Sequence, residues 1–213
     1  MKKIDIGTLV KLGAVVLLIL LLVINLSGMW VKIPLRKIKS DVPVNGNIET
    51  QLGKKKGDPD VVTVTVCYDR CVRGTWKNIV KSAKALNGLT LEPGDDFSWL
   101  RDVGNCGKEE GYVLGGGVGG LEYGGGICFT ATGFFRLMYS VKELEDDIHT
   151  YHHAHHDSVW YATDRNDATV DAEKGVDLSV KNESGRILKV RVKVNNKKRT
   201  ITYIGSLSQA HTP

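Results

Sequence analysis

In the sequence YGGGIC, at residues 123–128, a glycine turn leads directly into a cysteine and then into an apolar segment with the pattern of a helix. The helix is expected to span roughly residues 128–142. Four large apolar residues recur along it at the spacing of one buried helical face: Phe134, Leu137, Met138 and Val141. The sequence therefore predicts that Cys128 heads a helix that is packed into the protein core.

The segments before this turn predict one strand and one further helix. Valines recur over residues 61–66, as in a strand. Thr75 can cap a helix, which is expected to end near Asn87-Gly88. A chain of 213 residues is long enough for one domain with a core of this kind.

The last third of the chain has the pattern of antiparallel strands. Apolar and polar residues alternate over 176–180 and again over 188–203, with a turn at Asn195-Asn196. We therefore predict an α+β domain over residues 60–205, in which the Cys-headed helix packs on an antiparallel sheet. A short tail is expected over residues 206–213.

Residues 12–31 carry no charge and are numerous enough to cross a bilayer as a helix. No convincing cleavage site follows, so we predict an uncleaved signal anchor, with a cytoplasmic head over residues 1–11 and a linker over 32–59. Counting basic residues beside the span favours the opposite orientation, but a large C-terminal domain can be exported despite such charges. We expect a single-pass protein of the cytoplasmic membrane whose domain lies outside it.

The net charge of +5 is modest, and the basic residues gather over 32–56 and 189–199. These stretches are most simply solvated or in contact with lipid headgroups. Nucleic acid is not an expected partner, because no binding motif accompanies the charge. No cofactor is expected either, since the G-x-G-x-x-G match at residues 115–120 lacks the strand and helix of a nucleotide site.

Cys128 is the candidate nucleophile. A thiol at a helix N-terminus lies near unpaired N–H groups and the positive end of the helix dipole, which lower its pKa. His149 and Asp167 follow in an order that suits a base and the residue that orients it. Backbone N–H groups of the glycine turn are candidates to hold an oxyanion: Gly124, Gly125 and Gly126. From the residues alone, a structural, buried thiol is the alternative.

The glycine triplet and Cys128, with Thr130 and Thr132 after them, resemble the motif of the VanW family, in which a glycine triplet precedes a cysteine and a Ser/Thr-rich helix start. The resemblance covers roughly residues 72–194. Phe129 departs from it, because the family usually has a glutamine there, which can donate to an oxyanion or a substrate amide. The other matching segments are residues 83–88, 91–98, 103–112, 149–151, 167–170 and 177–182.

The family takes its name from glycopeptide-resistance gene clusters, among them those for vancomycin, and its members are typically exported or membrane-anchored. The resemblance favours Cys128, His149 and Asp167 as the site, with Thr130 beside the glycine turn. We predict a thiol-dependent amide or peptide hydrolase, or a transpeptidase-like acyltransferase, acting on peptidoglycan. The rival hypothesis is a non-catalytic envelope module that binds peptidoglycan, another anionic wall polymer or a membrane partner.

A third hypothesis is a metal-binding module built from a histidine-rich segment. Its candidate ligands alternate between the two faces if the segment is a strand, so a solvated, pH-sensitive loop is the alternative: His152, His153, His155 and His156. In an oxidising exterior Cys67, Cys71 and Cys106 can form disulfides. A bridge between Cys106 and Cys128 would remove the nucleophile.

Overall fold

The computed structural model describes residues 48–51, 60–68, 74–117, 119–152 and 167–210. Within this part of the chain no helix has the length and apolar character needed to span a membrane. The predicted anchor, residues 12–31, lies outside the described residues. Asp41–Pro213 form one compact unit, and the buried apolar residues form a cluster between Val62 and Leu207. A unit with its own core can fold without the residues that precede it.

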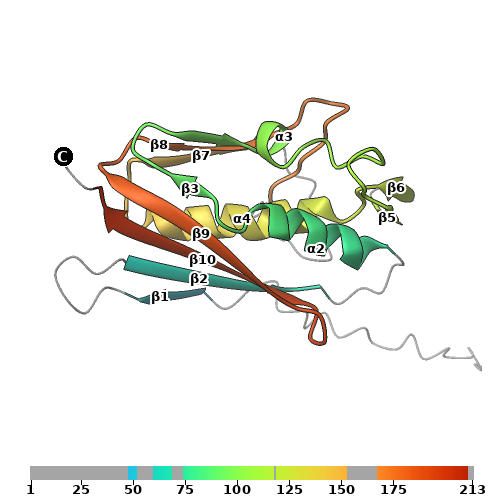
Figure 1. The fold of residues 1–213 in the computed structure, drawn as a ribbon, viewed down its shortest axis with the longest axis horizontal. Helices are drawn as coiled ribbons and strands as arrows, with labels where there is room; N and C mark the ends of the chain where they lie inside the picture. The colour runs from blue at the N-terminus through green and yellow to red at the C-terminus, as the bar shows by residue number, and fades with distance from the viewer. Residues whose placement is uncertain (1–47, 52–59, 69–73, 118, 153–166, 211–213) are drawn as a thin grey trace, which may run out of the picture. The chain divides into compact units, whose positions relative to one another are not determined.

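The largest sheet has five antiparallel strands in the order β1–β2–β10–β9–β3 (Figure 1). The strands are β1 (Ile48–Gln51), β2 (Asp60–Cys67), β3 (Thr90–Leu91), β9 (Arg186–Asn195) and β10 (Thr200–Gln209). From Val62 on, every second residue of β2 is buried, which places Val62, Val64 and Val66 in the core. Strands β9 and β10 form a long hairpin in which Val194 lies opposite Ile201, as the alternation predicted.

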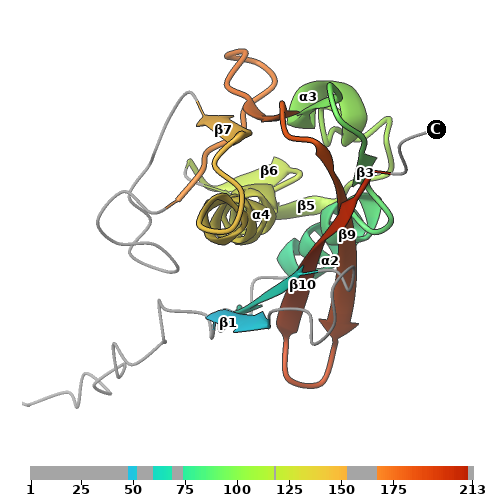
Figure 2. The ribbon, with the colours of Figure 1, turned by 90° about the vertical axis from the view of Figure 1, so that its left-hand side faces the viewer.

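Helix α4 (Ile127–Lys142) runs between this sheet and a second, three-stranded sheet (Figures 1 and 2). The second sheet consists of β4 (Asp96–Ser98), β8 (Leu178–Asn182) and β7 (Ile148–His152), in that order. The apolar stripe predicted for the helix is fully buried, and α4 contacts β2 and β10 of one sheet and β7 of the other. The α+β class and the buried Cys-headed helix are confirmed. The second sheet was not predicted.

Helix α2 (Thr75–Ala85) packs against α4, and a short helix, α3 (Trp99–Asp102), follows β4. Strands β5 (Leu114–Gly116) and β6 (Leu121–Tyr123) form a two-stranded hairpin beside α2. The prediction that Thr75 caps this helix is wrong, because Gly74 is the N-cap and Thr75 is the first helical residue. The Thr75 hydroxyl instead accepts a hydrogen bond from the Gly116 amide at 2.7 Å.

The sheet extends beyond both predicted ends of the domain. Strand β1 lies within the predicted linker, residues 32–59, and its Ile48 pairs with Val64. Strand β10 continues to Gln209, so part of the predicted tail, residues 206–213, belongs to the sheet. These segments are hard to recognise as strands because they carry few large apolar residues. Among the last four residues of β10, 206–209, only Leu207 is buried.

Asn182, at the end of β8, links the two sheets. Its buried side-chain amide donates to the carbonyl oxygens of Leu91 (2.9 Å), Glu92 (3.2 Å) and Arg186 (2.8 Å). These carbonyls belong to β3, the turn after β3 and β9. Because a buried amide requires such partners, an asparagine at this position serves the fold.

Helix α4 approaches β10 closely where glycines replace larger side chains. A Cβ atom at Gly133 would lie 2.4 Å from Cε2 of Tyr203, and one at Gly205 would lie 3.1 Å from Cγ2 of Val141. The Tyr203 hydroxyl donates to the Thr130 carbonyl at 3.2 Å. The distance between helix and sheet is therefore fixed by the missing side chain at Gly133.

We predict that Gly133→Ala destabilises the domain by about 1–3 kcal/mol, although alanine is the better helix former, because the added methyl group overlaps the buried Tyr203 ring. The free energy of unfolding from urea denaturation measures this. Gly185→Ala is the matched control, since nothing lies within 4 Å of a Cβ there. A Gly133→Ala protein as stable as the wild type would contradict the close approach.

Candidate functional site

The glycine turn before Cys128 is packed inside the protein. A Cβ atom would lie 2.5 Å from the Cys106 carbonyl oxygen at Gly124, 2.4 Å from the Gly115 carbonyl oxygen at Gly125, and 2.5 Å from a Thr75 methyl group at Gly126. Gly124 and Gly126 also have positive φ values of 74° and 104°. Glycine is required here by the close approach of the protein's own backbone.

Several amides in and just after this turn are already used, among them that of Gly125, one of the three candidate oxyanion donors. The N–H groups of Gly125, Ile127 and Phe129 donate to the carbonyls of residues 122, 124 and 126, at 3.1–3.2 Å. An oxyanion site needs free donors that point at the reacting atom. The glycine turn therefore offers less to a substrate than the sequence suggested.

The side chain of Asn78, on α2, holds this turn and the β5–β6 hairpin together. Its amide nitrogen donates to the carbonyls of Val113 (2.8 Å) and Gly125 (3.1 Å), and its oxygen accepts from the Val113 amide at 2.9 Å. Asn78 is almost fully buried. The sequence analysis missed it, because one asparagine in a helix has no pattern that distinguishes it from a solvated one.

Thr130 and Phe129 both face the interior. Thr130 is fully buried and joins the two helices, since its hydroxyl accepts from Ser82 Oγ at 2.9 Å and donates to the Ile79 carbonyl at 3.3 Å. Its role beside a substrate stays a prediction, and in this structure the hydroxyl serves the packing of the helices. Phe129 packs edge-on against Tyr68, with ring centroids 5.2 Å apart. Phenylalanine at the family's glutamine position thus extends the apolar core.

Cys128 lies in the first turn of α4, where its thiol donates to the Val170 carbonyl at 3.5 Å. Burial raises the pKa of this thiol to about 11, and the negative charges of Glu122, Asp167 and Asp171 act in the same direction. The lowered pKa expected from the helix N-terminus is therefore wrong. Loss of solvation and three nearby carboxylates disfavour the thiolate.

The structure brings Asp167 to Cys128. Asp167 is fully buried, and the segment that it begins runs along the start of α4, where the Ala168 amide donates to Thr132 Oγ1 at 3.2 Å. Asp167 acts on the Cys128 thiol by its charge.

His149 lies at the other end of the helix. The Glu145 amide bonds the Val141 carbonyl and the Ile148 amide bonds the Glu145 carbonyl, so β7 begins where α4 ends. The helical rise from Cys128 to Val141 is about 20 Å. His149 Nε2 instead lies 3.3 Å from a Glu183 carboxylate oxygen. Cys128 and His149 are therefore not brought together.

Cys106 and Cys128 are both free thiols, so no disulfide joins them. Cys106 is buried, which raises its pKa. Among the residues that the structure describes, no three His, Cys, Asp or Glu side chains converge as metal ligands. Cys71, His153, His155, His156 and the side chain of His152 lie outside that description.

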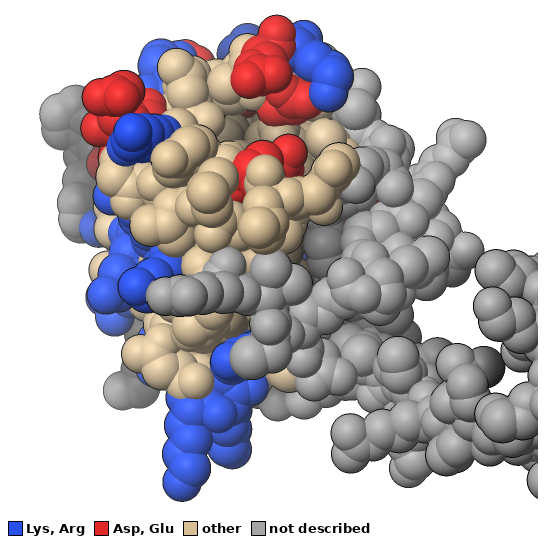
Figure 3. All heavy atoms as spheres, turned by 90° about the vertical axis from the view of Figure 1, so that its right-hand side faces the viewer, with Lys and Arg blue, Asp and Glu red and all other residues tan. Residues whose placement is uncertain are grey.

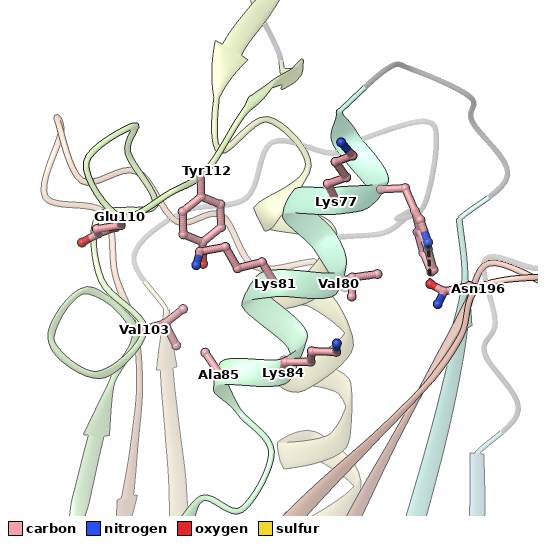
Figure 4. A pocket seen from close by; sticks show the side chains of 10 residues that line it. Lys77, Val80, Lys81, Lys84, Ala85, Val103, Glu110, Tyr112 and Asn196 are labelled. Carbon is pink, nitrogen blue, oxygen red and sulfur yellow. Dashed lines mark hydrogen bonds between the residues drawn. The ribbon is translucent and has the colours of Figure 1, made fainter.

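A groove of about 770 Å³ runs along the outer face of α2 (Figure 4). Three exposed lysines of the helix line it, Lys77, Lys81 and Lys84. Lys81 Nζ lies 5.3 Å from the centroid of the Tyr112 ring, a cation–π geometry. The remaining lining residues are Trp76, Val80, Ala85, Val103, Glu110, Tyr112 and Asn196.

The groove is predominantly basic. Glu110 is its one acidic lining residue, and the Glu110 carboxylate already accepts the amides of Asn105 (3.0 Å) and Gly107 (3.2 Å). At the opposite wall Trp76 Nε1 donates to Asn196 Oδ1 at 3.0 Å, which fixes the indole against the tip of the β9–β10 hairpin. The arrangement suits an anionic ligand. The i, i+4, i+7 spacing of the lysines could have indicated this face.

Comparison with family models matches residues 74–204 to the family described as VanW like protein. No curated protein and no solved structure matches the chain significantly.

We predict that Cys128 reacts slowly with iodoacetamide at pH 7.5, because a pKa of about 11 leaves well under about 1% of the thiol ionised. The rate should rise with pH up to about 11, as the thiolate forms. Mass spectrometry of alkylated peptides separates Cys128 from the half-buried Cys67, which serves as the internal control. Rapid labelling of Cys128 near neutral pH that His149→Ala abolishes would contradict this and restore the thiol-enzyme hypothesis.

Proposed function

Because the chain belongs to the VanW-like family, a family associated with the cell envelope and vancomycin resistance, we propose that it is an envelope binding module that holds an anionic wall polymer beside α2. The observation that carries this proposal is the basic groove. Residues 12–31 would anchor the chain in the cytoplasmic membrane, with the domain on the outer side, where such polymers occur.

The spacing of the lysines favours a linear polymer over a small anion. Lys77, Lys81 and Lys84 succeed one another along α2 with axial separations of about 6 and 4.5 Å. In Figure 4 their side chains fan out from the helix instead of converging on one point. Repeated negative charges along a chain, such as phosphodiesters or the carboxylates of peptidoglycan stem peptides, can contact them in succession.

The apolar part of the groove suits the uncharged part of such a polymer. Val80 and Ala85 lie on the same face of α2 as the lysines, and Val103 and Tyr112 line the opposite wall. Sugar rings and alditol chains have apolar C–H faces that pack on such side chains. Binding sites commonly combine an apolar lining with a few placed charges.

The surroundings of Cys128 support binding over thiol catalysis. A nucleophilic cysteine needs a lowered pKa and a base within hydrogen-bond reach. Here burial and carboxylates raise the pKa of Cys128, and His149 lies beside Glu183. Cys128, Asp167 and the glycine turn then serve to seat α4.

We expect Lys77→Gln, Lys81→Gln and Lys84→Gln together to weaken binding of poly(glycerol phosphate) to residues 41–213 by roughly tenfold or more at physiological salt, because exposed charge contacts are individually weak but add along a polymer. Binding of the wild type should also weaken as salt is raised, because the charges are screened. Isothermal titration calorimetry measures both effects.

The matched control removes three positive charges from the exposed face of β9, by Lys189→Gln, Arg191→Gln and Lys193→Gln. These residues do not line the groove. The control should bind within about twofold of the wild type. Equal losses of affinity in the two triple variants would mean that binding depends on net charge and not on the groove, which would contradict the proposal. A wild type that does not bind the polymer would also refute it.

A further inference from the structure

Trp76 supplies the basic groove with an aromatic ring that is held in one orientation. The indole Nε1–H donates to Asn196 Oδ1 at 3.0 Å, and a dashed line in Figure 4 marks this bond. The Tyr68 ring stacks on the indole, with ring centroids 6.4 Å apart and an angle of 18° between the planes. Tyr68 is itself buried and packs edge-on against the buried Phe129. The indole is therefore fixed both at its N–H edge and by its stacking on Tyr68.

The rest of the indole is open to the groove. Trp76 is only partly buried, and it is one of the residues that line the groove. A side chain that is already held in its binding orientation loses little conformational entropy when a ligand packs on it. Trp76 therefore has the properties of a stacking platform.

The charges around Trp76 restrict what can stack on it. The face of an aromatic ring is negative, so it attracts cations and the weakly positive hydrogens of C–H groups. Lys77 follows Trp76 in α2, and Lys197 and Lys198 lie in the exposed β9–β10 turn. Figure 3 views the end of the molecule where this turn lies, and the charged side chains visible in its lower half are Lys and Arg. These positive charges repel a cationic ligand and favour one that presents C–H groups.

Asn196 adds hydrogen-bond donors beside the ring. An indole N–H can only donate, so the side-chain oxygen of Asn196 faces it and the amide NH₂ group is directed away from Trp76. Asn196 is exposed, and within the described part of the chain its NH₂ group donates to no acceptor. A second aromatic ring could stack on Trp76 but would offer these donors nothing. A pyranose ring suits both residues, because it has an apolar C–H face and hydroxyl groups around its edge.

We propose that the groove selects a sugar-substituted anionic polymer, with a hexopyranosyl unit stacked on Trp76 and hydrogen-bonded to the Asn196 amide, and this rests on the function proposed above. Lys77, Lys81 and Lys84 then hold the charges of the polymer backbone. Trp76 precedes this row at the N-terminal end of α2, so the sugar lies at one end of the lysines. Trp76 and Asn196 determine which substituent the bound polymer carries.

The test compares poly(glycerol phosphate) with and without glucosyl substituents, by isothermal titration calorimetry on residues 41–213. The wild type should bind the glucosylated polymer roughly tenfold more tightly, because of the stacked ring and the added hydrogen bonds. Trp76→Ala should abolish this preference. Tyr139→Ala is the matched control, because it removes an aromatic ring that is 63% exposed on α4 and does not line the groove, and it should keep the preference.

Thermal melting checks the fold of each variant, since Trp76 also packs against the core. Asn196→Ala is the second variant, because Asn196 is exposed in a turn, and it should lower the preference by about threefold or more. Equal binding of the two polymers by the wild type would overturn the proposal and leave the lysine groove in place, whereas binding of neither polymer would refute both. A glucosyl preference that survives in either folded variant would mean that the sugar binds elsewhere, and would also overturn the proposal.

Discussion

The buried amide of Asn78 is the interaction on which the arrangement of the domain depends. It satisfies the backbone of Val113 and of Gly125, two segments far apart in the sequence, from one position on α2. These bonds seat the glycine turn at the head of α4 and fix the β5–β6 hairpin beside it. They also fix α2 itself, whose other face carries the lysine groove. Removing the Asn78 amide would leave the polar groups of these three hydrogen bonds unpaired in a low-dielectric interior, which costs much folding free energy.

Several residues of the family-like motifs have packing roles in this structure. The glycine triplet allows three backbone segments to meet within the distance of a missing Cβ, and Thr130 joins α4 to α2. Asn182 connects the two sheets, and the Asp177 carboxylate accepts the amides of Leu100 and Leu178. Positions shared by a family can thus reflect the demands of packing as readily as those of chemistry.

Much of the fold was predictable where one periodicity dominates. The stripe of α4 and the alternation of β9 and β10 follow from side-chain burial within a single element. The second sheet, the strand β1 and the end of β10 escaped prediction because their pairing is decided by partners distant in the sequence. The site was less predictable for the same reason. Order along the chain suggested Cys128, His149 and Asp167 together, but the turn after α4 leaves His149 at the far end of the helix.

We propose that the groove along α2, and not the neighbourhood of Cys128, is the binding surface of the domain. The direct test is an NMR titration of ¹⁵N-labelled residues 41–213 with poly(glycerol phosphate). We expect the amide shifts of Lys77–Lys84 and Asn196 to change on binding, while those of Cys128 and Val170 stay unchanged. Shifts that gather around Cys128, Asp167 and Val170 and leave α2 unaffected would contradict it.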